Sequence, residues 1–117
     1  MKGMAVSALL TLAVIAAIPA AAQEKARFSE AEVAQGLTAE RNLVHYIHLS
    51  GVLTDLLREQ KRVYHANHQG EPNTLAADVE DLLNEAGMAA SRSDFDAAWA
   101  SMEKSSKLLF ASLKESR

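Results

Sequence analysis

Cysteine is absent from this 117-residue chain, and its absence excludes several kinds of chemistry at once. Without thiols the chain forms no disulfide, holds no thiolate-bound metal, attaches no haem through a CxxCH motif and performs no cysteine catalysis. Whatever fold the chain adopts must therefore be held together by packing alone.

Aromatic residues and catalytic motifs are also scarce. The chain has one tryptophan and two tyrosines, which argues against an aromatic-lined catalytic cleft. The HExxH, P-loop and GxSxG motifs are missing, as is the Glu-x-x-His pair of di-iron helical proteins. Four serines near the C-terminus are predicted on a solvated helix face, where no base activates them: Ser101, Ser105, Ser106 and Ser112. The sequence predicts that the protein is not an enzyme.

Positive charge is in short supply. Without residues 1–22, the chain carries 11 basic and 15 acidic residues, a net charge of −4 with neutral histidines. A mildly acidic chain is poorly suited to the phosphate backbone of nucleic acids. We therefore expect no nucleic-acid partner.

A long apolar run occurs only at the N-terminus. Lys2 supplies a positive charge, residues 5–18 are apolar, and three alanines ending at Ala22 precede Gln23. This layout is typical of a secretory signal peptide. The apolar run of 14 residues is shorter than the about 20 residues that a membrane-spanning helix needs. No cysteine follows it that could carry a lipid anchor.

These features predict an exported protein. We expect a signal peptide over residues 1–22 and a single domain over residues 23–117, located in the periplasm or secreted, with no stable membrane anchor after cleavage. A domain of this size holds a modest hydrophobic core.

The longest helical pattern covers residues 39–68. Its apolar residues recur at spacings of three, four and seven, as in an amphipathic helix: Leu49, Val52, Leu53, Leu56, Leu57, Val63 and Tyr64. Apolar residues upstream, from Val33 to Ile47, point in a different direction from this stripe when all are placed on one ideal helix, so the apolar stripe shifts near residue 47. A break near Gly36, a bend near Gly51 or a second packing surface would each explain this shift. Gly51 costs about 1 kcal/mol relative to alanine inside a helix, so a compensating role is expected. Its lack of a side chain would allow another helix to approach closely.

Two further helices are predicted around a short connection. Asn73 or Thr74 caps the first, which ends near Ala89, and Ser93 caps the second. The short connection makes the pair an antiparallel hairpin. No segment alternates with the period of a strand, so the predicted fold is all-α.

A short segment ahead of the longest helix leaves the number of helices open. Ser29 and Glu32 fit a capping box for a helix to about Gln35, followed by an interruption at residues 36–38 with Thr38 as the next cap. The prediction is an antiparallel helical bundle of three main helices, or four if this segment separates. The long first helix would extend beyond its partners, and a second copy of the chain would cover the overhang.

All four histidines lie in two HxxH pairs. The side chains of His45 and His48 share a helix face, as do those of His65 and His68, with Cβ atoms about 5–6 Å apart. Such pairs can chelate zinc, copper or nickel, and Glu71 continues the second pair at the same spacing. The pairs are about 30 Å apart on a straight helix, so they form two separate half-sites. The competing interpretation gives the histidines structural roles. His65 and His68 would be cations favoured near a helix C-terminus, and His45 would be a hydrogen-bonded core residue.

The segment over residues 75–117 is similar to the C-terminal hairpin of periplasmic cytochrome b562-type bundles. The similarity lies in residues 79–86 and 96–99. It implies an antiparallel helical hairpin. That family binds haem through a histidine late in the last helix and a methionine early in the first, and this sequence has neither. Haem is therefore a less favoured cofactor than copper, zinc or nickel. Met102 lies in the helical stripe of Phe95 and Trp99 and is assigned to the core.

Two hypotheses about function follow. The first is a small exported helical protein that acts by binding, through contact of its long first helix with a protein partner or with a second copy. The alternative is a periplasmic protein that binds a transition metal or haem through the HxxH pairs.

Overall fold

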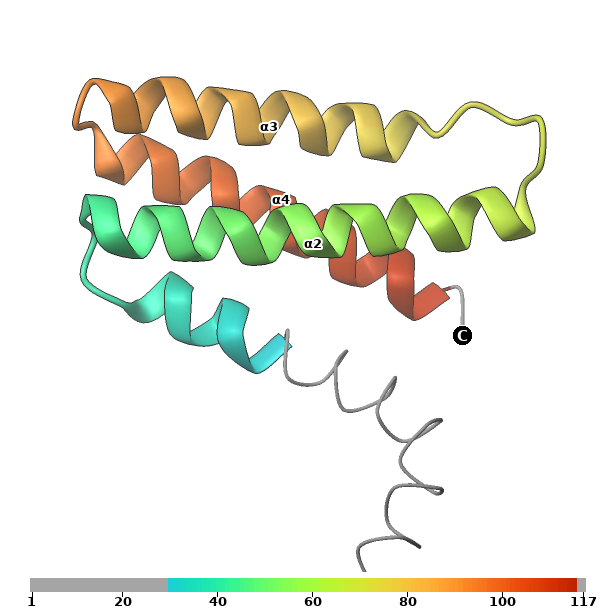
Figure 1. Ribbon diagram of the computed structural model, residues 1–117, viewed down its shortest axis with the longest axis horizontal. Helices are drawn as coiled ribbons and strands as arrows, with labels where there is room; N and C mark the ends of the chain where they lie inside the picture. Colours follow the sequence, from blue (N-terminus) through green and yellow to red (C-terminus); the bar gives the residue numbers. More distant parts are fainter. Residues whose placement is uncertain (1–29, 116–117) are drawn as a thin grey trace, which may run out of the picture.

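The computed structural model describes residues 30–115, which are helical apart from three short connections (Figure 1). Four helices lie in this range: residues 30–38, α2 (Leu43–Asn67), α3 (Thr74–Ser91) and α4 (Phe95–Glu115). No strand occurs within residues 30–115. The all-α prediction is confirmed, and the short segment is a separate fourth helix. The predicted signal peptide, residues 1–22, lies outside the described residues.

The three long helices contact one another in every pairwise combination. Figure 1 shows α3 returning alongside α2, and α4 running back from the end of α3. The first helix lies against the N-terminal half of α2, on the side away from α3.

The core is built from leucines of α2 and small residues of α3. Leu49, Leu53, Leu56 and Leu57 of α2 are buried, as the periodicity predicted. Burial of each leucine stabilises the fold by about 1.5–3 kcal/mol. The other buried apolar residues come from all the remaining helices: Val33, Ala76, Val79, Ala86, Ala89, Ala90, Ala98, Trp99, Met102 and Leu109. The assignment of Met102 to the core is confirmed.

Each long helix begins at a side chain that accepts a backbone N–H. Asn42 accepts from His45 N at 2.9 Å, Asn73 from Ala76 N at 3.2 Å, and Asp94 from Ala97 N at 3.2 Å. Such caps satisfy amide groups that have no partner within the helix.

Two predicted caps were wrong. Thr38 ends the first helix, because its hydroxyl donates to the carbonyls of Ala34 and Gln35 rather than accepting an amide ahead of it. The longest helix therefore begins at Leu43 and not at residue 39. Ser93 has a φ of 60°, outside the extended conformation that a cap adopts, and the next residue, Asp94, takes the role.

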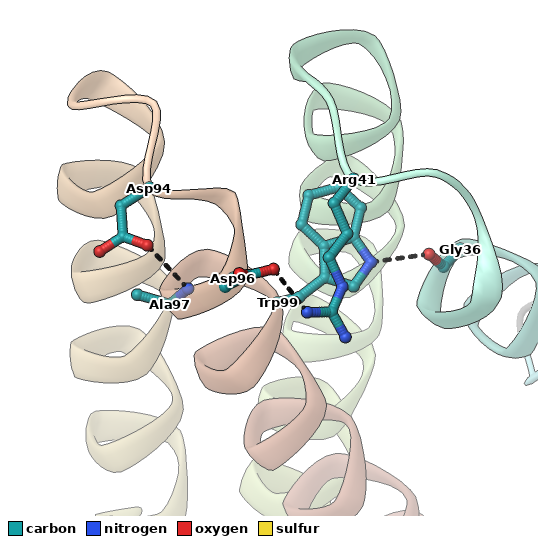
Figure 2. Close-up of polar contacts among 6 residues, drawn as sticks. All are labelled: Gly36, Arg41, Asp94, Asp96, Ala97 and Trp99. Atoms are coloured by element: carbon teal, nitrogen blue, oxygen red, sulfur yellow. Dashed lines mark hydrogen bonds and ion pairs between the residues drawn. The ribbon is translucent and has the colours of Figure 1, made fainter.

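The first helix is held by Trp99 of α4. The indole Nε1 donates a buried hydrogen bond of 3.0 Å to the carbonyl of Gly36 (Figure 2). A Cβ added at Gly36 would lie 2.7 Å from Cδ1 of Leu49, so glycine here permits close packing against α2. The interruption predicted at residues 36–38 lies at residues 39–42 instead, and Gly36 itself is helical.

Two serines predicted to face solvent are instead buried. Ser105 is 0% exposed and Ser106 is 4% exposed. Their hydroxyls donate to the carbonyls of Ser101 and Glu103 within α4. A serine satisfied by its own helix fits into a core without leaving a polar group unpaired.

Candidate functional site

The first HxxH pair lies near the N-terminus of α2, and its two imidazoles have different partners. The Nδ1 atom of half-buried His45 is 2.6 Å from the carbonyl oxygen of Glu40. The Nε2 atom of exposed His48 is 3.4 Å from Oε2 of Glu32, on the first helix. The partner of His48 thus comes from a different helix, and no local sequence spacing reveals this pair.

The second HxxH pair lies at the C-terminal end of α2. The Nδ1 atom of His68 is 3.3 Å from Oε2 of Glu71. Its ring stacks on that of Tyr64, with centroids 4.4 Å apart. His65 is exposed and lines, with His68 and Glu71, an open hollow of about 290 Å³.

Neither pair belongs to a larger ligand cluster within the described part of the chain. Among residues 30–115, no three histidine, aspartate or glutamate side chains are grouped so that they could hold a metal ion together. Structural zinc sites have four ligands and catalytic ones three. Residues 30–115 therefore offer two-ligand half-sites at most.

The cations in the second half of α2 all have acidic partners. Arg58 bonds Asp55 at 2.9 Å and Arg62 bonds Glu59 at 2.7 Å, while Lys61 bonds Glu80 of α3 at 2.8 Å. The hydrogen bond and charge of Glu59 raise the pKa of the Arg62 guanidinium. These pairs reduce the attraction of this surface for an anionic partner.

The first half of α2 exposes large apolar side chains. Leu43 is 54% exposed, Val44 72% and Ile47 60%. The shifted apolar stripe is thus explained in two ways: residues 33 and 37 belong to a separate helix, whereas residues 44 and 47 face solvent. We call Leu43, Val44 and Ile47 the apolar patch.

An open hollow of about 540 Å³ lies beside the apolar patch. Its lining includes Glu32, Ile47, His48, Gly51 and Asp55. A Cβ added at Gly51 would meet nothing within 4 Å, so no described part of the chain uses the space above this glycine. A glycine inside a helix costs about 1 kcal/mol relative to alanine, and residues 30–115 gain no contact from it in return.

Neither a membrane span nor a known relative helps to assign this site. Among the helices of residues 30–115, none is long and apolar enough to cross a bilayer. The chain matches no family model, no curated protein and no solved structure.

Proposed function

We propose that this is an exported helical protein that acts by protein–protein contact rather than catalysis, and that the partner at the apolar patch is a second copy of the chain. The observation that carries the proposal is the patch itself, 54–72% exposed, next to a glycine with open space above it. Clustered exposed apolar side chains are typical of interaction sites.

The face of α2 is complementary to itself in an antiparallel contact. Val44 and Gly51 are seven residues apart, two helical turns, and so share one face of the helix. If a two-fold axis passes beside Ile47 and His48, Val44 of each copy lies opposite Gly51 of the other. The protruding valine then fills the space over the glycine, as a two-fold interface requires.

Charge is distributed along α2 in a way that suits this register. The apolar ends of the two faces overlap at the centre, and the Asp55–Arg58 pair of each copy lies at the rim. Interfaces commonly combine an apolar centre with solvated polar groups at the edge.

The expected dimer is weak. In this register α2 of one copy overlaps α2 of the other over residues 43–52 only, a face about 14 Å long and about 10 Å wide. This footprint is well below the roughly 800 Å² per partner of stable dimers. Reversible association at high protein concentration is therefore expected.

Sedimentation equilibrium of the protein in EDTA tests the proposal. We expect concentration-dependent dimerisation that the double substitution Val44→Glu with Ile47→Glu abolishes, because it places four carboxylates at the centre of the contact. The matched control is Met88→Glu on α3, an equally exposed position (61%), which should dimerise as the parent does. A parent that stays monomeric at millimolar concentration, or dispersal by Met88→Glu alone, would contradict the proposal.

The export half of the proposal has its own test. Cleavage after Ala22 predicts Gln23 as the first residue of the exported chain. Mass spectrometry of the intact exported protein reads this directly, and a chain that retains residues 5–18 would contradict it.

A further inference from the structure

The atoms of His48 and Glu32 are spaced as two ligands of one metal ion. Nε2 of His48 lies 3.4 Å from Oε2 of Glu32. Two ligands about 2.05 Å from a tetrahedral metal are about 3.3 Å apart. An imidazole nitrogen and a carboxylate oxygen both suit divalent zinc, copper and nickel.

This pair has the access that a metal ion needs. The His48 side chain is 63% exposed and that of Glu32 is 21% exposed, so the imidazole is open to solvent while the carboxylate is more restricted. Both residues line the hollow beside the apolar patch. The pair joins two helices, so a metal there would also fix the first helix against α2.

Two ligands from one chain do not complete a tetrahedral site, and residues 30–115 supply no third one nearby. A two-fold axis beside Ile47 and His48 would bring a second such pair close to the first. The two-fold axis that relates two antiparallel helices is perpendicular to the plane containing both of them. Rotation about this axis keeps a residue on the same side of that plane, so a residue at one edge of the contact lies at the same edge in both copies. The two His48–Glu32 pairs would then meet along one side of the interface.

We propose that a divalent transition metal, zinc by its preference for four tetrahedral nitrogen and oxygen ligands, binds between two copies through His48 and Glu32 of each. This inference rests on the antiparallel contact proposed above and adds the metal that strengthens it. The site differs from both HxxH chelates, because its second ligand is Glu32 of another helix and because His45 is not required.

The metal would determine how firmly the copies associate. A ligand that binds only the dimer shifts the monomer–dimer equilibrium toward the dimer by mass action. The small helix face supplies little affinity, so assembly should respond strongly to zinc. Zinc would bind in a ratio of one ion to two chains.

Sedimentation and native mass spectrometry of tag-free protein, in EDTA and with added Zn²⁺, test this inference. We expect zinc to tighten dimerisation at least tenfold, with one ion in each dimer. Glu32→Gln, which lies off α2, should remove the zinc effect while leaving the weak dimer in EDTA. His48→Ala should also remove the zinc effect, but it lies at the centre of the contact and is not used to judge the dimer in EDTA. The matched control His68→Ala removes the histidine of the other carboxylate pair and should behave as the parent does.

A separate variant tests whether the metal acts at the proposed contact. Gly51→Leu places a side chain where the structure leaves open space, so the fold should tolerate it, as far-ultraviolet circular dichroism would show. It blocks the approach of Val44 from the other copy, and we expect it to abolish dimerisation both with and without zinc.

The outcomes distinguish the two proposals. A dimer in EDTA that binds no zinc, or that loses zinc with His68→Ala, overturns the metal site and leaves the contact standing. Zinc bound one to one by a monomer also overturns the metal site. A zinc-linked dimer that Gly51→Leu does not affect overturns the proposed contact, and with it the inference. A protein that stays monomeric in both conditions overturns both.

Discussion

At the scale of single residues, two glycines of helical segments have opposite environments. Gly36 lies on the buried side of the first helix, where an added Cβ would approach Leu49 Cδ1 to 2.7 Å. Gly51 lies on the outer side of α2 with nothing within 4 Å. The same residue type is thus a packing requirement at one position and has no role within the described monomer at the other.

Gly36→Ala and Gly51→Ala are therefore expected to change stability in opposite directions. Gly36→Ala should lower the free energy of unfolding by about 1–2 kcal/mol, because crowding of Leu49 outweighs the gain in helix propensity. Gly51→Ala should raise it by about 0.5–1 kcal/mol, since only the propensity changes. Urea unfolding at low protein concentration measures both, and a change of the same sign in the two variants would contradict the packing described for Gly36.

At the scale of elements, the first helix depends on its docking. Its described part covers residues 30–38 and is held by a few contacts with α2 and α4. Its anchors are Val33, which is 2% exposed, the bond from Trp99 to Gly36 and the Glu32–His48 pair. The connection is also fastened, since Arg41 bonds Asp96 of α4 at 2.7 Å (Figure 2).

Val33→Ala should loosen this helix and leave α2, α3 and α4 folded. Loss of two buried methyl groups costs about 1–2 kcal/mol, a large fraction of what these few contacts supply. Hydrogen exchange should accelerate at the backbone amides of residues 34–38 and stay unchanged around Leu53. Val44→Ala, at an exposed valine, is the matched control; equal exchange in the two variants would show that Val33 is not an anchor.

At the scale of the whole molecule, a buried glutamine joins the three long helices. Gln60 of α2 is 1% exposed. It exchanges two hydrogen bonds with Asn73, of 2.9 and 3.3 Å, and donates to Ser112 of α4 at 3.2 Å. Asn73 also caps α3, so one side chain fixes the register of α2 against both of the others.

Gln60→Ala is expected to destabilise the entire fold. It removes the side-chain partner of half-buried Asn73, and leaving such a polar group poorly satisfied costs about 1–3 kcal/mol. Thermal and urea unfolding should show a single transition at lower stability, detected alike by circular dichroism and Trp99 fluorescence. The exposed Gln69→Ala is the matched control and should stay within about 0.5 kcal/mol of the parent. An unchanged midpoint for Gln60→Ala would contradict this role.

Several features could be predicted because they depend on local periodicity. The leucine stripe from Leu49 to Leu57 repeats with the helical period, and burial follows directly from that pattern. The cap at Asn73, one of the two predicted candidates, was readable for the same reason, since cap preferences are properties of a few adjacent residues. Ser105 and Ser106 were misplaced because polar character alone does not reveal whether a hydroxyl is satisfied inside its helix.

The sequence by itself determined the helical class, the absence of thiol chemistry and the apolar side chains of α2, because composition and period act at short range. Only the tertiary structure decided which of those side chains find a partner. It buried Val33 in the core and left Val44 and Ile47 in solvent, and it brought Glu32 to His48 from another helix. Contacts between residues far apart in the chain depend on how the helices pack, and no local pattern contains that information.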